Sequence, residues 1–151
     1  MDPFTISTGV LACISISLQA LVGLKQLKAN VDGGSIGSAL IDVLASDISG
    51  LRQVLQFMEE AYQDIEDDWA LTETGHAAIH WRDLRQCLND QHWVLSDFVE
   101  MLFDLNKKVK IHAPSRMKSR LQSAAVRFVL VRQQVQAYMD AFQVSLEVLI
   151  L

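Results

Sequence analysis

Apolar residues recur at alternating steps of four and three in three long stretches of the chain, at about 36–68, 74–108 and 115–150. This spacing places them on one face of an α-helix. The stripe positions are Leu44, Ile48, Leu51, Leu55, Met58, Tyr62, Ile65 and Trp69 in the first stretch, Ala77, Trp81, Leu84, Leu88, Gln91, Leu95, Phe98, Leu102, Leu105 and Val109 in the second, and Leu121, Ala124, Phe128, Val131, Val135, Tyr138, Phe142, Ser145 and Leu149 in the third. One polar residue, Gln91, occupies a stripe position of the second stretch. No stretch alternates with a period of two for long enough to indicate a strand.

The opening stretch, at about 3–29, differs from the others because it has no single apolar face. Asp2 and Pro3 form a typical helix start, and no charged residue occurs between Phe4 and Leu24. A helix that is apolar on every side lies centrally in a bundle or contacts lipid, and this run is about long enough to span a bilayer. Ser and Thr residues dilute its apolar character, and both alternatives stay open.

Small residues at a spacing of four follow one side of this opening helix, at Thr5, Gly9, Cys13 and Ser17. Rows of this kind let two helix backbones approach closely, in membranes and in protein cores. We predict that the helix contacts a membrane or a protein partner through residues on and beside this row. The predicted contact residues are Phe4, Ile6, Gly9, Val10, Cys13, Ser17 and Leu21.

Together these patterns predict an all-α protein, an antiparallel bundle of four long helices with an apolar first helix, in one domain over residues 1–151. Breaks are expected at Asp32-Gly33-Gly34 and at Pro114. Half of the residues are apolar, which excludes a disordered chain. With only 7 Gly and 2 Pro, the composition also disfavours a turn-rich β-fold.

The net charge of −5 is unevenly distributed, with balances of −2, −9 and +6 over residues 1–50, 51–105 and 106–151. One interpretation is that acidic and basic helices attract one another within the bundle. In the other, the basic stretch contacts anionic lipid head groups. Its cations are Lys107, Lys108, Lys110, Arg116, Lys118 and Arg120. Cations at the C-terminus of the third helix also interact favourably with the negative end of its helix dipole. Nucleic acid is not expected as a partner, because the protein is acidic overall and its basic stretch has few aromatic residues.

Patterns that carry catalytic or metal chemistry are weak. His76 and His80 share a helix face, but the further ligands that zinc needs are not evident. Cys13 lies in an apolar run and is expected to be an inert core thiol. Only two cysteines are present, so a disulfide framework is not expected and a reducing, cytoplasmic setting is favoured. We therefore expect a non-enzymatic protein without a metal or cofactor.

The first ten residues, MDPFTISTGV, resemble the start of fungal HeLo-like N-terminal domains. The order of the elements that follow, up to a last helix containing AFQVSL at 141–146, extends this likeness over essentially the whole chain. Such domains precede nucleotide-binding and repeat modules in fungal NLR/STAND-type proteins and also occur in proteins of azaphilone pigment clusters. The resemblance therefore implies a helical bundle.

The resemblance further implies a signalling or effector domain of an intracellular defence or cell-death protein. It would reside in the cytoplasm and associate with membranes on activation, through the helix at Phe4–Leu24. Two other functions stay open. One is a structural oligomerisation or adaptor module, whose apolar helix is buried by self-association or by a protein partner. The other is an accessory protein of a pigment cluster, with a pocket inside the bundle near Gln91 or Cys13.

Overall fold

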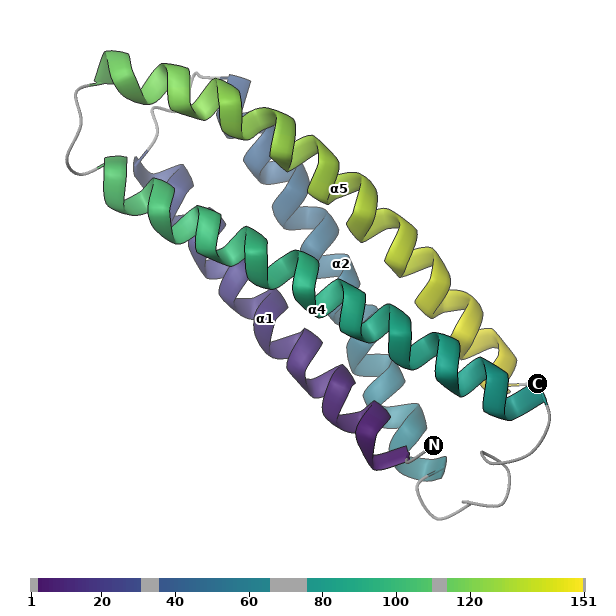
Figure 1. Ribbon diagram of the computed structural model, residues 1–151. Helices are drawn as coiled ribbons and strands as arrows, with labels where there is room; N and C mark the ends of the chain where they lie inside the picture. The colour runs from purple at the N-terminus through teal and green to yellow at the C-terminus, as the bar shows by residue number, and fades with distance from the viewer. Residues whose placement is uncertain (1–2, 31–35, 66–75, 110–113, 151) are drawn as a thin grey trace.

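The computed structural model describes residues 3–30, 36–65, 76–109 and 114–150, and all of them are α-helical (Figure 1). The helices are α1 (Pro3–Asn30), α2 (Ile36–Ile65), α4 (His76–Val109) and α5 (Pro114–Ile150). The predicted bundle of four long helices is confirmed over this part of the chain. Predicted and observed helix ends agree within one residue wherever both are described, while the predicted ends at 68 and 74 lie outside the described residues.

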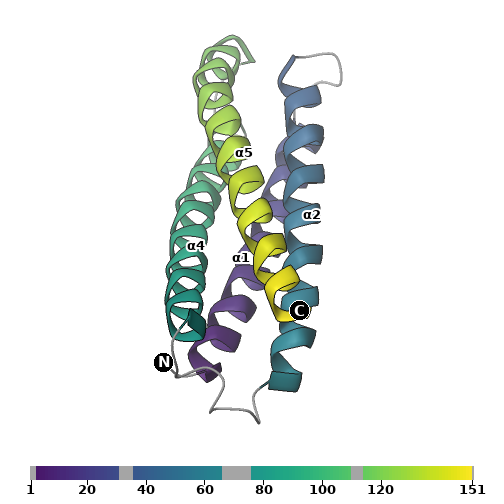
Figure 2. The same ribbon diagram turned by 90° about the vertical axis from the view of Figure 1, so that its right-hand side faces the viewer.

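Helices that follow one another in sequence run antiparallel, but the two helical hairpins lie side by side (Figure 2). As a result, α1 and α5 each pack on both α2 and α4, and α1 and α5 occupy diagonally opposite corners. Gly9 faces Leu88 and Gly23 faces Leu102, so α1 and α4 run parallel. The order around the bundle is therefore α1, α2, α5, α4, and two of its four packed pairs are parallel.

The predicted stripes form the core between the helices. Almost all of the stripe positions whose side chains are described are buried, because each helix turns this face inward, whereas Val109, Leu121 and Tyr138 are half-buried. Phe98 of α4 and Phe128 of α5 pack edge to face, with ring centroids 5.6 Å apart and planes at 87°. The opening helix adds a further set of buried apolar side chains, namely Val10, Cys13, Ile16, Ala20, Leu24 and Leu27.

The apolar opening helix is a corner helix and not a central one. Its inner side is buried, but Leu11, Leu18 and Val22 lie on its outer side with exposed fractions of 50, 41 and 57%. Of the two alternatives left open for this helix, a central position sheltered on every face is therefore not the one that the bundle shows. Four helices of similar length around one core leave each helix with two neighbours and one outward face.

Ion pairs between helices link the basic end of the sequence to acidic residues elsewhere. Arg132 Nε of α5 lies 2.7 Å from Asp47 Oδ2 of α2, and Arg127 Nη2 of α5 lies 2.6 Å from Asp97 Oδ2 of α4. These contacts support the interpretation that oppositely charged helices attract one another. Partly exposed pairs of this kind contribute about 0–1 kcal/mol each, so they align the helices while the core supplies most of the stability.

Gln91 is the polar member of the α4 stripe, and it is fully buried. Its side-chain oxygen and nitrogen have no hydrogen-bond partner among the described residues. A buried amide without partners loses its hydration and gains nothing in return. The buried amide of Gln91 therefore destabilises the folded state.

We expect Gln91→Leu to raise the free energy of unfolding by about 1–3 kcal/mol, since it removes an uncompensated buried amide and keeps the side-chain volume similar. Urea denaturation followed by circular dichroism measures this change. Gln91→Ala is the control, because it removes the same amide but leaves a cavity. If the Gln91→Leu variant is less stable than the wild type, the side-chain amide of Gln91 has hydrogen-bond partners in solution.

Candidate functional site

The opening helix packs against α4 through glycines. A Cβ atom added at Gly23 would lie 3.1 Å from Cδ1 and 3.2 Å from Cβ of Leu102, whereas one at Gly9 would lie at least 3.5 Å from Leu88. The Cβ of Leu102 is fixed to its backbone, so a larger residue at Gly23 would push the two helices apart. Gly9 of the predicted small-residue row faces α4 with room for a Cβ atom, and the tight approach lies at Gly23, outside that row.

Two side-chain hydrogen bonds cross the same α1–α4 interface. Cys13 Sγ donates to the carbonyl oxygen of Leu88 at 3.2 Å, and Asn106 Nδ2 donates to the carbonyl oxygen of Gly23 at 3.1 Å. Asn106 Oδ1 is buried and has no partner among the described residues. The interface thus combines small side chains with a few polar contacts, and buries less large apolar surface than a leucine-rich seam would.

Burial raises the pKa of the Cys13 thiol from 9.0 to about 12, and a hydrogen bond with the backbone of His92 offsets this only in part. Burial also raises the pKa of Cys87, as do the charges of Asp90 and Asp83. Both thiols are therefore protonated at neutral pH. Cys13 is also fully buried, which fits the expected inert core thiol.

The predicted membrane- or partner-contacting residues face inward in the closed bundle. Val10, Cys13 and Ser17 are buried, and Gly9 and Leu21 are half-buried. The side chains of the other two predicted residues, Phe4 and Ile6, lie outside the described part of the structure. A membrane or partner would reach Val10, Cys13 and Ser17 only after α1 leaves its place between α2 and α4.

The exposed face of α1 was missed from the sequence. Leu11, Leu18 and Val22 are seven and four residues apart and share one outward face. The sequence signal for this exposed face was that Leu11, Leu18 and Val22 are apolar and lie off the small-residue row. Within the described helices, Ser7–Asn30 is the one segment long and apolar enough to cross a membrane, with a mean hydropathy of 1.7, and about a third of it is buried. A core helix can meet the same criterion, so the exposed face is the more specific observation.

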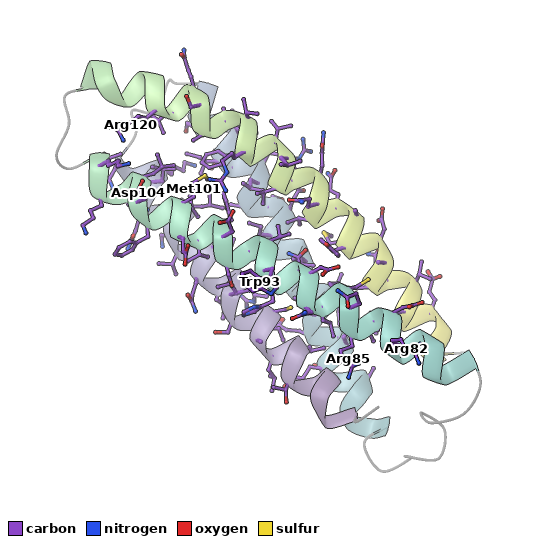
Figure 3. All side chains as sticks on the ribbon, viewed as in Figure 1. Arg82, Arg85, Trp93, Met101, Asp104 and Arg120 are labelled. Carbon is purple, nitrogen blue, oxygen red and sulfur yellow. The ribbon has the colours of Figure 1, made fainter. Side chains whose placement is uncertain are left out.

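The predicted basic cluster is partly assembled at one end of the bundle, where Asp104 of α4 and Arg120 of α5 lie near each other (Figure 3). A hydrogen bond from Lys108, at 2.8 Å, lowers the pKa of Asp104, and the charges of Lys108, Arg120 and Lys107 lower it further. The structure thus brings three of the six predicted cations around one carboxylate. The side chains of the other three, Lys110, Arg116 and Lys118, lie outside the described residues.

An exposed aromatic residue adjoins this basic cluster. Phe103 is 70% exposed, and the Nζ atom of Lys107 lies 5.9 Å from the centre of its ring. A groove of about 420 Å³ beside them is lined by Gln26, Ala29, Asn30 and Asn106. Cations next to an exposed ring suit an interface between water and an apolar phase.

A larger groove, of about 520 Å³, lies between α1 and α4 beside Gly9 and Leu88. Neither Gln91 nor Cys13 lines it, so it is not the internal pocket considered for a pigment-cluster protein. In the described part of the chain, no three His, Cys, Asp or Glu residues are placed to hold a metal ion. The side chains of His76 and His80 lie outside that part.

No family model matches the chain, and neither a curated protein nor a solved structure matches it significantly. The HeLo-like resemblance of residues 1–10 stays a prediction.

Two Gly→Ala substitutions on α1 are expected to have opposite effects. Gly9→Ala should stabilise the protein by up to about 1 kcal/mol, because alanine favours helix and its Cβ meets only ordinary contacts. Gly23→Ala should destabilise it by about 1–2 kcal/mol, because overpacking against Leu102 outweighs the gain in helix propensity. Thermal or urea unfolding measures both. Equal stabilisation by the two variants would contradict the close approach at Gly23.

Thiol labelling is expected to report the separation of α1 from α4. At neutral pH Cys87 should react with a soluble thiol reagent well before Cys13, whose thiol is buried and protonated. Gly23→Ala should speed the labelling of Cys13 and leave that of Cys87 unchanged. Mass spectrometry of the labelled protein distinguishes the two sites, and rapid labelling of Cys13 in the wild type would show that the interface is already open.

Proposed function

We propose that this chain is a cytoplasmic, non-enzymatic helical effector domain that acts on membranes through α1. The observation that carries the proposal is the uncharged run from Phe4 to Leu24, of which the outer face, at Leu11, Leu18 and Val22, is exposed to water. The HeLo-like resemblance of the first ten residues supports the same role in an intracellular defence or cell-death protein.

Transfer to a bilayer would shelter more of α1 than the bundle does. The closed bundle buries about a third of the apolar segment, whereas a lipid phase surrounds a helix on every side. Each square ångström of apolar surface removed from water contributes about 25 cal/mol. The outer face of α1 therefore favours membrane contact, and the buried residues Val10, Ile16 and Leu24 oppose its release from the core.

The cations of this chain lie where they would assist such contact. Because α1 and α4 run parallel, their C-terminal ends lie at the same end of the bundle (Figure 2). Lys25 and Lys28 of α1 and Lys107 of α4 are exposed there. A basic residue near an anionic membrane surface contributes about 1 kcal/mol of binding, so we infer that this end approaches negatively charged lipid.

A second candidate function, an oligomerisation or adaptor module, is favoured by exposed apolar side chains on α5. These include Val126, Leu130 and Val144. The two functions are compatible, since α5 lies diagonally across the bundle from α1.

A dye-leakage assay with vesicles tests the membrane function. We expect the wild type to release dye from vesicles containing anionic lipid more readily than from neutral vesicles. Leu18→Asp should abolish release, because it places a charge in the middle of the outer face of α1. Gly23→Ala should increase release, because it loosens α1 from α4.

Phe57→Asp is the matched control, since it adds the same charge at an exposed apolar position on α2. Circular dichroism establishes that each variant is folded. The proposal fails if the wild type and Gly23→Ala both leave anionic vesicles intact. It also fails if Leu18→Asp and Phe57→Asp release dye equally.

A further inference from the structure

The larger groove between α1 and α4, of about 520 Å³, has no part in the membrane function. Its volume lies in the range of small-molecule sites, about 300–1,000 Å³. The two helices line it with Thr8, Gly9 and Ala12 from α1, and with Arg85, Gln86, Leu88, Asn89 and His92 from α4. No acidic residue of the described chain lines it, although the protein carries 18 acidic and 13 basic residues. Positive charge and hydrogen-bond donors thus gather in one groove of an acidic protein.

The polar wall of the groove is a row of side chains along α4. Arg85, Asn89 and His92 are four and three residues apart, so they share one face of the helix. None of them has an acidic residue three or four positions away on α4, and α1 carries no charge from Phe4 to Leu24. Arg85 forms no ion pair among the described residues, whereas two arginines of α5 lie within 2.7 Å of aspartates. The charge of Arg85 is therefore available to a ligand.

The acidic residues of α4 lie on another side of the helix. They repeat every seven residues, at Asp83, Asp90, Asp97 and Asp104. Arg85 and His92 each follow one of them by two positions, about 200° around an ideal helix. Asp97 pairs with Arg127 of α5 at 2.6 Å. The acidic side of α4 is therefore directed to α5, and its basic side borders the groove with α1.

Small residues on α1 leave the space opposite this row unfilled. A Cβ atom added at Gly9 would lie at least 3.5 Å from Leu88, so the packing of the two helices does not require a glycine there. Gly9 and Ala12 instead keep the α1 wall of the groove low. Arg85 extends from α4 toward the first turns of α1 (Figure 3). A molecule in the groove would therefore contact both helices.

The donors in the row determine the chemistry of the ligand. A guanidinium presents paired N–H donors to the oxygens of a phosphate or carboxylate, and the amide of Asn89 and the ring of His92 can also donate. Arg85 and His92 are seven residues apart, about 10 Å along the helix at 1.5 Å per residue. One carboxylate does not cover this length, whereas a phosphate ester carries oxygens on its phosphate and on its alcohol.

We propose that the groove between α1 and α4 binds a phosphate ester, with Arg85 on the phosphate and Asn89 and His92 on further oxygens. The bound ester contacts both helices and holds α1 against α4. The inference goes beyond the membrane function, since the groove lies toward the N-terminal ends of these helices and the exposed lysines lie at the other end. Small soluble esters and lipid head groups share this chemistry.

Two probes separate the soluble source of the phosphate ester from the lipid source. Glycerol 3-phosphate is measured by calorimetry, and vesicles of phosphatidylcholine containing phosphatidic acid, which carries the same ester, by co-sedimentation. Arg85→Gln should weaken binding about tenfold or more, because it removes a charged donor, and Asn89→Ala should weaken it severalfold. Arg82→Gln is the matched control, since it removes the same charge from an exposed position of α4 outside the groove. Its affinity should equal that of the wild type.

The thiol of Cys13 reports whether the ligand bridges the two helices. Its Sγ atom donates to the carbonyl oxygen of Leu88, a residue that lines the groove. Labelling of Cys13 requires α1 to separate from α4, so glycerol 3-phosphate at ten times its Kd should slow this labelling about tenfold. The rate at Cys87, which does not line the groove, should stay unchanged. Arg85→Gln should remove the protection at the same concentration.

Binding of either probe that depends on Arg85 supports the site and identifies the source of the phosphate. Three results would overturn the proposal. The first is that neither probe binds the wild type more tightly than Arg85→Gln. The second is an equal loss of affinity in Arg82→Gln, which would show a general effect of charge. The third is binding without protection of Cys13, which would place the ligand on α4 alone. Dye release enters none of these results, so failure of the membrane function leaves this test intact.

Discussion

The close, parallel approach of α1 to α4 is the contact on which the rest of the arrangement depends. Gly23 allows it, since a side chain at this position would press against Leu102. With α4 beside α1, the second hairpin must lie alongside the first, and α5 then falls beside α2 and diagonally across from α1. The same contact turns Leu11, Leu18 and Val22 outward and brings the cationic ends of α1 and α4 together. A uniformly apolar helix thereby acquires an inner face and an outer face.

The helices and most of the core were predictable because α2 and α4 are amphipathic over thirty residues or more and α5 carries a regular inner stripe, and periodicity is the strongest local signal. Their buried positions, such as Leu51, Phe98 and Val135, follow from that signal alone. The opening helix has no single apolar face, so its sequence could not show which side faces the core. Neither the order of the helices around the bundle nor the contact at Gly23 has a local signature, because both depend on how the hairpins pack.

The candidate site was predictable only in part, because the sequence shows which residue types occur along a helix but not which helices they contact. Gly9 and Cys13 of the small-residue row lie at the interface between α1 and α4. The exposed residues Leu11, Leu18 and Val22 could not be assigned to an outer face from the sequence, because this assignment depends on how α1 packs in the bundle. The basic stretch predicted cations at one end. Asp104 pairs with Lys108 one turn along the same helix, whereas Arg120 joins them only through the packing of α5 on α4. On α5, periodicity alone predicts the inner stripe that contains Phe128 and Phe142.

The side-by-side packing of the hairpins has a consequence for how the chain folds. Contacts between α1 and α2, and between α4 and α5, join neighbours in sequence, so each hairpin closes over a short loop at small entropic cost. Contacts between α1 and α4, and between α2 and α5, span long separations and form only when the hairpins dock. Folding should thus proceed by rapid closure of two local units followed by a slower docking step.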